Sequence, residues 1–437
     1  MVERLFREES GRLIALLTRL LGPAHLALAE DVTQEAFIAA LGSWPRRGVP
    51  DNPSAWLLQV ARRRALDVLR RDESFAARAT TIAAEFETAA DTLDAHDALT
   101  AHAESARADD DPFADDRLRM ILLCCHPVVS DDSRVALTLK TVSGFSVGEI
   151  ARAFLAEETA IAQRLVRAKR ALRDANVTFA MPEGADLDAR RRSVLDVLYV
   201  MFNEAHTAHE GVDLVRLELA AEALRLVERL LRHEQTRAPE VSALAAMFCF
   251  HAARFPARTS ADGALRRLAE QDRTQWDQAL IARGFHHLDA AARGATLSTY
   301  HCEAQIASLH AIAPSWEATD WERIVAVYDR LLALHPSSVV ALNRVVAVRM
   351  LRGADGAWRE FTRIDKKDPI VRTYLYHAVR ADLLEARGRP DEAQAAWETA
   401  RELARSTPLQ LHMEQRVTEL AAARFSCDVD SATVRPS

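Results

Sequence analysis

The 437 residues include only 14 glycines and 15 prolines, under 7% of the chain against about 12% in an average protein. So few turn formers exclude a many-stranded barrel or sandwich, and a chain with 49% hydrophobic and 27% charged residues is not wholly disordered, so we expect an all-α fold in two or three domains. The formal net charge of −7 would argue against a nucleic-acid partner only if charge were spread evenly, so its distribution along the chain decides.

The beginning of the chain gives no sign of export. The first residues, MVERLFREESGRLIALL, place charges where a signal peptide needs an unbroken apolar run. No uncharged stretch exceeds thirteen residues, whereas a membrane span needs roughly 18. The five cysteines are an odd, scattered set, which indicates reduced thiols and no disulfide framework. We therefore expect a cytoplasmic protein without a membrane partner.

Residues 1–73 are predicted to form a first helical domain. Leucines recur at helical spacing up to Leu21, where Gly22 and Pro23 interrupt them, and a second helix is expected over 27–41. Residues 44–53 (WPRRGVPDNP) hold three prolines and a glycine, which predicts a loop. The helix that Ser54 then opens, running to about residue 71, carries one acidic residue, Asp67, among a basic set: Arg62, Arg63, Arg64, Arg70 and Arg71.

An acidic linker is predicted over residues 74–116. This stretch holds eleven acidic residues and only two basic ones, Arg78 and Arg107. Such a composition favours a flexible tether over a packed domain. Two interpretations remain open: a solvated linker, or an acidic strand that threads a basic channel in a partner.

Residues 117–178 form the second predicted domain, which contains a helix-turn-helix over residues 144–175. We expect Val147, Ile150 and Ala151 to pack the first helix, with a bend at residues 154–155. In the second helix four apolar residues share one face: Ile161, Leu165, Ala168 and Leu172. The opposite face is strongly basic and has no acidic residue between 160 and 173. We predict that it binds DNA through Gln163 and Arg164 at base edges and through Arg167, Lys169 and Arg170 at phosphates.

The rest of the chain, residues 179–437, is predicted to be a helical-repeat domain. Pro336, Pro369 and Pro408 lie 33 and 39 residues apart and each follows a helix pair, close to the 34-residue period of tetratricopeptide hairpins. The apolar stripes of such repeats pack against neighbouring repeats. Their concave surface is left for a protein partner or for another domain of the same chain.

Three segments together resemble bacterial RNA polymerase sigma factors of the extracytoplasmic-function (group four) type. AEDVTQEAFIAAL (29–41) looks like their polymerase-binding helix and NPSAWLLQVARRRALDVLRR (52–71) like the helix that reads the minus-ten element. The 144–174 segment is similar to their minus-thirty-five-reading helix-turn-helix. Together with LLCCHPVVSDDSRVALTLKTVSGFS (122–146), the long tail resembles the subgroup with a C-terminal tetratricopeptide-like extension.

The resemblance implies partners and contact residues. Core RNA polymerase would be bound through Asp31, Gln34, Glu35 and Phe37. Promoter DNA would be gripped at the minus-ten and minus-thirty-five elements. The loop 46–53 would capture a flipped minus-ten base, and the arginines of the following helix would hold phosphates. Many relatives carry Asn where Arg64 stands, so base preference does not transfer there.

No catalytic, cofactor or metal site is predicted. The adjacent Cys124 and Cys125 lack the spacing of a zinc grip, and the segment with His206 and His209 matches neither metalloprotease pattern. The sequence therefore predicts a non-enzymatic sigma factor whose C-terminal domain regulates it. The alternatives are a helix-turn-helix repressor or scaffold that acts without polymerase and, less favoured, a metalloenzyme built around the two histidines.

Overall fold

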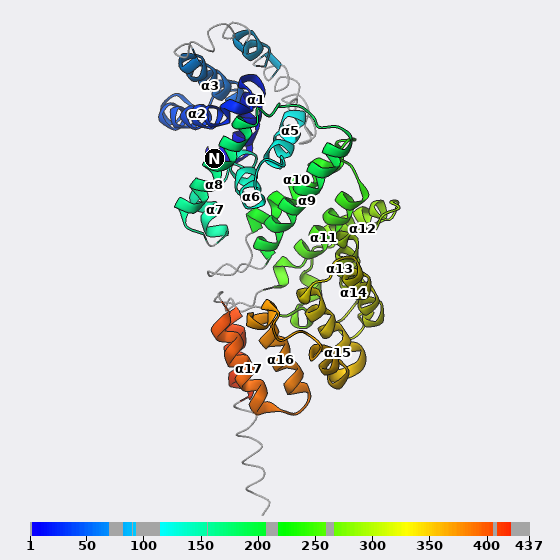
Figure 1. The fold of residues 1–437 in the computed structure, drawn as a ribbon. Helices are drawn as coiled ribbons and strands as arrows, with labels where there is room; N and C mark the ends of the chain where they lie inside the picture. The colour runs from blue at the N-terminus through cyan, green and yellow to red at the C-terminus, as the bar shows by residue number, and fades with distance from the viewer. Residues whose placement is uncertain are drawn as a thin grey trace, which may run out of the picture. The chain divides into compact units, whose positions relative to one another are not determined.

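The computed structural model describes residues 2–69, 82–89, 91–92, 114–154, 156–206, 217–258, 266–404 and 409–420. Over these residues the chain is helical and contains no strand, as the composition predicts (Figure 1). It divides into two compact units, Met1–Val200 and Met201–Ser437. No helix among the described residues combines the length and the apolar character needed to cross a membrane.

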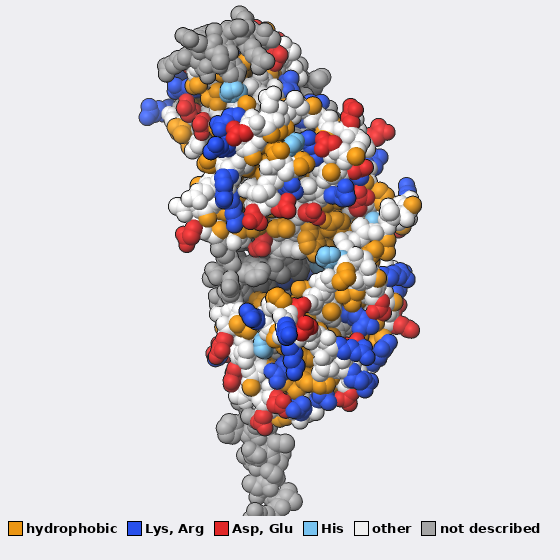
Figure 2. Space-filling model, viewed as in Figure 1, with side chains coloured by type: hydrophobic (Ala, Val, Ile, Leu, Met, Phe, Trp, Pro, Cys, Tyr) orange, Lys and Arg blue, Asp and Glu red, His pale blue; other side chains and the backbone are white. Residues whose placement is uncertain are grey.

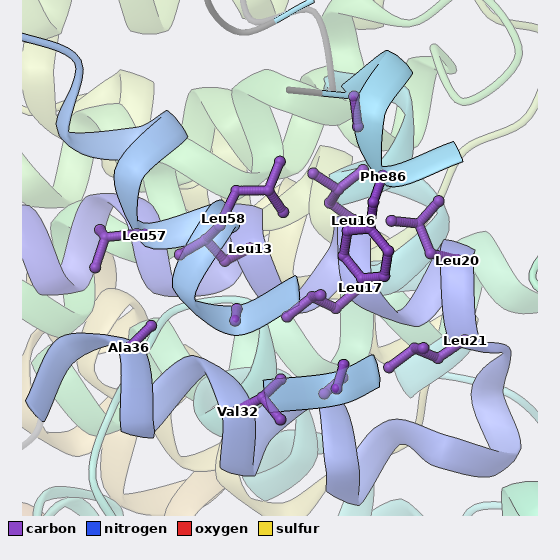
Figure 3. Close-up of a cluster of buried hydrophobic side chains, with 14 of the residues drawn as sticks. Leu13, Leu16, Leu17, Leu20, Leu21, Val32, Ala36, Leu57, Leu58 and Phe86 are labelled. Atoms are coloured by element: carbon purple, nitrogen blue, oxygen red, sulfur yellow. The ribbon is translucent and has the colours of Figure 1, made fainter. Parts of the chain in front are cut away.

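The first part of unit 1 is a helical bundle around a leucine-rich core. Its helices are α1 (Val2–Leu21), α2 (Leu26–Arg47) and α3 (Pro53–Leu69), with a short 3-10 turn, η1 (Pro23–His25), between the first two. Figure 3 shows Leu13 of α1 next to Leu58 of α3, and Leu16 and Leu17 of α1 next to Phe86, all in one buried cluster. Burial of this apolar face holds the three helices together.

Two predictions for the region need correction. Helix α2 continues through Pro45 to Arg47, so the loop expected from residue 44 begins only at Gly48, whose φ of +85° ends the helix. Residues 82–89, assigned to the tether, form a helix whose Ile82, Phe86 and Ala89 pack in the same core, and Phe86 is fully buried (Figure 3). Three apolar residues at spacings of four and three suffice to dock one helical face, despite the acidic composition around them.

The second part of unit 1 contains four short helices. They are α5 (Ala114–Cys124), α6 (Asp131–Thr141), α7 (Val147–Ala153) and α8 (Glu158–Asp174). This part packs on the bundle. A Cβ atom added to Gly11 of α1 would lie 1.9 Å from the backbone oxygen of Val142, and Arg19 Nε is 2.9 Å from Asp116 Oδ2.

The boundary between the units falls inside α9 (Gly184–His206). Arg134 of α6 donates a hydrogen bond of 3.2 Å to Ser193 Oγ, so the first half of α9 packs with unit 1. The compact unit thus extends beyond residue 178, where the sequence placed the end of the second domain.

Unit 2 is built from antiparallel helix pairs and short 3-10 turns. Its longer helices are α10 (Leu217–Arg232), α11 (Pro239–Ala252), α12 (Gln278–Ala291), α13 (Thr299–Ile312), α14 (Trp321–Leu334), α15 (Ser338–Phe361), α16 (Tyr374–Ala386) and α17 (Pro390–Leu403), followed by a helical segment over 409–420. Helix α11 is buried from Val241 to Phe250, which explains why it has no polar face. A turn at Gly388, with a φ of +67°, joins α16 to α17.

The proline spacing corresponds in part to these helix pairs. Pro336 lies between α14 and α15, and Pro369 opens the 3-10 turn η5 (Pro369–Arg372) before α16. Pro408 lies outside the described residues. Helix α15 is bent at Gly353, where φ is +73°, and therefore consists of two helices joined by a kink. A tetratricopeptide-type repeat remains a prediction.

Candidate nucleic-acid and polymerase interface

Helix α8 is positioned by the short helix that precedes it. Ser146 caps α7: its hydroxyl accepts a hydrogen bond from Glu149 N, and its own N–H donates to the Glu149 carboxylate, at 3.1 and 2.7 Å. This capping box fixes where α7 begins. The two helices are separated only by residues 154–157, the length of a helix-turn-helix bend.

The predicted buried face of α8 is confirmed. Ile161, Leu165, Ala168 and Leu172 are all less than 5% exposed. The opposite side presents Gln163, Arg167 and Arg170 to solvent, while Arg164 is half-buried. Arg170 Nε is 3.2 Å from Asp174 Oδ2, an exposed pair one turn away that contributes little to stability. The geometry therefore supplies a basic, solvent-facing ridge with the polar Gln163 near its N-terminal end.

Lys169 differs from the other predicted DNA contacts. Its ammonium forms an ion pair with Glu30, which begins the acidic stretch of α2 and is only 9% exposed. Burial raises the pKa of Glu30, an effect that Lys169 and the nearby Lys140 oppose. Lys169 therefore links the two parts of unit 1 in this structure and is only half-exposed.

Helix α3 presents its central arginines in three different ways. Arg62 donates a hydrogen bond of 2.6 Å to Glu87 of the 82–89 helix, and Arg64 Nε lies 3.2 Å from Glu35 of α2. Arg63 is exposed. The predicted phosphate contacts Arg70 and Arg71 lie outside the described residues.

On α2, three of the four predicted polymerase contacts are exposed: Asp31, Gln34 and Glu35. Phe37 requires a correction, because it is only 2% exposed and packs in the core of the bundle. It belongs to a buried stripe of α2 that also includes Thr33, Ala40 and Trp44. The exposed apolar residues are instead Ile38 and Leu41, at 60% and 56%. Their positions four and seven residues after Gln34, on the same helical face, were the signal that could have found them.

Comparisons with known proteins agree with this geometry. Residues 5–75 match the family described as Sigma-70 region 2, and residues 119–172 match Sigma-70, region 4. An uncharacterized protein of Rhizobium meliloti is 36% identical over 398 residues, which cover 91% of each chain. The chain belongs to the extracytoplasmic-function sigma factors and carries a C-terminal extension. Residues 190–292 of the extension match a family of unknown function, DUF6596, and no solved structure matches the chain.

In this sigma factor, Asn52 and Pro53 define the start of α3. Asn52 Oδ1 accepts a hydrogen bond of 2.8 Å from Ala55 N, and Pro53 occupies the first helical position, where its missing N–H costs nothing. Trp56 stacks edge-on against Trp44, with ring centroids 5.4 Å apart. Of the segment 46–53 that the resemblance assigns to a flipped base, residues 48–52 lie between the two helices that carry these tryptophans.

The cysteines of region 4 are structural. Cys124 and Cys125 are fully buried, and burial raises the pKa of both thiols, that of Cys124 to about 12. The segment proposed as a weaker metal site contains His209, which lies outside the described residues.

One group of described side chains has the composition of a metal site. Glu228 of α10, Cys249 of α11 and His287 of α12 bring one potential ligand atom each within 4.8 Å of the others. His287 Nε2 lies 2.9 Å from Glu228 Oε1, and Arg283 Nε lies 3.5 Å from the same oxygen. The Arg283 guanidinium therefore places a positive charge beside these potential ligand atoms. Because the three residues come from three helices, sequence spacing gave no sign of them.

Sigma-70 regions 2 and 4 give this protein two partners, core RNA polymerase and promoter DNA. Figure 2 shows basic and acidic side chains intermixed on the visible face. The net charge of −7 is therefore compatible with a local basic ridge such as that of α8.

Proposed function

We propose that this sigma factor directs core polymerase to promoters with two spaced elements, without catalytic chemistry of its own. The observation that carries the proposal is the two-sided character of α8. Four buried residues lock the helix in place while Gln163, Arg167 and Arg170 face solvent. A helix of this kind can enter the major groove by its N-terminal half.

We assign different tasks to the residues of α8. Gln163 and Arg164 stand closest to the N-terminal end and would contact base edges. Arg167 and Arg170 lie about one and two turns further along and would hold phosphates, a contact that carries affinity without sequence information. Lys169 would join them only if its ion pair with Glu30 opened.

In region 2, DNA and polymerase contacts would occupy neighbouring helices. Arg62, Arg63 and Arg64 of α3 would neutralise phosphates of the opened minus-ten region, together with Arg70 and Arg71. On α2, Asp31, Gln34 and Glu35 would pair with basic or polar groups of the polymerase. Ile38 and Leu41 complete this face and would supply the apolar anchor.

The C-terminal extension would regulate the two sigma regions. Its first helix, α9, packs with region 4 through Ser193 and Arg134 and continues into unit 2. Any change in the extension that displaces α9 would therefore reach region 4 directly. This arrangement would take the place of a separate regulatory protein.

Run-off transcription with purified core polymerase tests the proposal. Wild type should start transcripts on promoters enriched with the protein in cells, and the double variant Arg164→Glu and Arg167→Glu should not. The control is the double variant Arg352→Glu and Arg359→Glu, an equal charge reversal at exposed positions of α15, which should keep start-site selection. Equal transcription by all three proteins would contradict the assignment of α8.

The repressor alternative predicts a different result. A repressor binds duplex operator alone, whereas a sigma factor needs core polymerase to select the same site. Tight binding of the isolated protein, with no transcript when core is added, would favour the repressor. Removal of residues 217–437, which leaves α9 in place, tests regulation: unchanged promoter output in cells would exclude that role.

A further inference from the structure

Unit 2 contains a cavity that neither sigma region accounts for. Its volume is about 600 Å³, and its walls come from α13 to α17, the 409–420 helix and residues 267–269. This volume lies in the range of small-molecule sites and is too small for a docked helix. Five aromatic side chains contribute to the lining: Trp316, Trp321, Tyr328, Tyr374 and Trp397.

One corner of the cavity is a cluster of flat rings. The ring centroids of Trp316 and Trp321 are 4.4 Å apart at an interplanar angle of 68°, and His310 stacks parallel to Trp316 at 6.0 Å. Trp321 is 8% exposed, and its Nε1 has no hydrogen-bond partner among the described residues. An indole N–H can only donate, so the corner offers an unused donor beside aromatic surface.

Further unpartnered nitrogen atoms come from the C-terminal side of the cavity. His412 is 8% exposed and its Nε2 has no partner within the described part of the chain; the same holds for Arg416 Nε. A buried donor of this kind is costly unless something accepts from it. The lining therefore has unused capacity to donate hydrogen bonds from two directions.

The carboxylates of the lining are already engaged. Asp382 lies 2.7 Å from Arg349 and 3.8 Å from Arg267. Glu385 accepts hydrogen bonds from Trp397 Nε1 and from Arg416. Arg267 and Arg416 also pair with Glu270 and Glu419, so the charged groups at this end of the cavity pair with one another.

A group of arginines lies behind the aromatic corner and supplies positive charge there. Arg273 donates hydrogen bonds of 2.6 and 2.7 Å to the backbone oxygens of His310 and Ala313, at the end of α13. The buried Arg254 lies near Arg273 and Arg258, and burial together with these charges lowers its pKa to about 9. Burial and the same arginines lower the pKa of His310 to about 3, so its ring is neutral at pH 7. The potential around the cavity favours an anion.

We propose that this cavity binds a small flat organic anion, of the class of aromatic carboxylates. The ring would lie against Trp316, Trp321 and Tyr374. The carboxylate would accept hydrogen bonds from the unpartnered donors Trp321 Nε1 and Arg416 Nε. This assigns a ligand site to the extension and goes beyond its proposed regulatory role, since binding requires neither polymerase nor DNA.

Calorimetric titration of the full-length protein tests the site. The probes are benzoate, 1-naphthoate and indole-3-carboxylate. Each is compared with an amine that carries the same ring, such as 1-naphthylmethylammonium for 1-naphthoate. At least one carboxylate should bind saturably at one site per chain, and its amine should bind at least tenfold more weakly. Trp321→Phe, which keeps a ring and removes the N–H, should weaken carboxylate binding about fivefold to tenfold.

Trp276→Phe is the matched control. Trp276 is also a buried tryptophan, 4% exposed, with an unpartnered Nε1 within the described residues, but it does not line the cavity. This variant should bind the probes like wild type, and circular dichroism with thermal melts shows that both variants are folded.

Several results would overturn the proposal. One is that no carboxylate of the panel binds below millimolar concentration, and another is that amines and carboxylates bind equally. Equal affinity of the two tryptophan variants would place the binding elsewhere. Saturable binding of the acidic peptide ADDDPFADD (residues 108–116) without binding of any small carboxylate would assign the cavity to a peptide.

Discussion

Lys169 of the recognition helix α8 is ion-paired with Glu30 of α2, although 139 residues separate them in the chain. Glu30 is 9% exposed and its Oε1 has no other partner among the described residues. The ion pair therefore joins region 2 to region 4 at a place shielded from solvent. A residue expected to touch DNA is used, in this structure, to hold the two sigma regions together.

The burial of Glu30, which outweighs the opposing effect of Lys169 on its pKa, makes the stability of unit 1 depend on pH in a defined direction. Burial raises the pKa of Glu30 above its ordinary value of 4.5, so the folded chain binds this proton more readily than the unfolded chain. The stabilisation is complete below pH 4.5 and is lost as the pH rises through the folded-state pKa. Glu30→Gln removes the titration and keeps the shape of the side chain.

Thermal melts from pH 4 to pH 7 check this expectation. The unfolding temperature of wild type minus that of Glu30→Gln should decrease as the pH rises over this range. A constant difference between the two proteins would show that Glu30 is not titrating as a buried group.

The packing of α1 against region 4 gives a second prediction. A Cβ at Gly11 would lie 1.9 Å from the Val142 backbone oxygen, which cannot move aside as a side chain could. Gly11→Ala should therefore destabilise unit 1 by about 1–3 kcal/mol. Gly42 of α2 is the control, since a Cβ there meets nothing within 4 Å.

Gly42→Ala should instead stabilise the helix by about 0.5–1 kcal/mol, because alanine loses less backbone entropy. Urea denaturation of the two variants measures both effects. If Gly11→Ala were as stable as Gly42→Ala, the two regions would not pack as closely as described here.

The sequence predicted local periodicity well and long-range pairing poorly. The buried face of α8 followed from the spacing of Ile161 and Leu165 alone. Phe37 was misplaced because its resemblance-based role took precedence over its helical spacing from Ala40 and Trp44, which are buried with it. The 82–89 helix was missed because the acidic composition outweighed the spacing of its apolar residues. No pattern within one segment could have paired Lys169 with Glu30, which meet only through tertiary packing.

The salt dependence of promoter binding distinguishes phosphate contacts from base contacts. Arg167 is exposed on α8, and we assign it to a phosphate. For the holoenzyme, Arg167→Ala should weaken binding to all promoters about equally and reduce the slope of log affinity against log salt by about one. Gln163→Ala should leave the slope unchanged and alter the preference for base sequence. Identical slopes for wild type and Arg167→Ala would remove Arg167 from the interface.

The buried His310 predicts that unit 2 is sensitive to acid. Burial and the charges of Arg254 and Arg273 lower its pKa to about 3, whereas the unfolded side chain takes up a proton near its ordinary value of 6.5. Stability is therefore lost as the pH falls from 6.5 toward 3, because only the unfolded chain binds the proton in this range. His310→Gln should lose less unfolding temperature between pH 7 and pH 4.5 than wild type does. The control is His335→Gln, at an exposed position, whose unfolding temperature should fall between pH 7 and pH 4.5 as much as that of wild type. An equal fall in all three proteins would show that His310 does not cause the acid sensitivity.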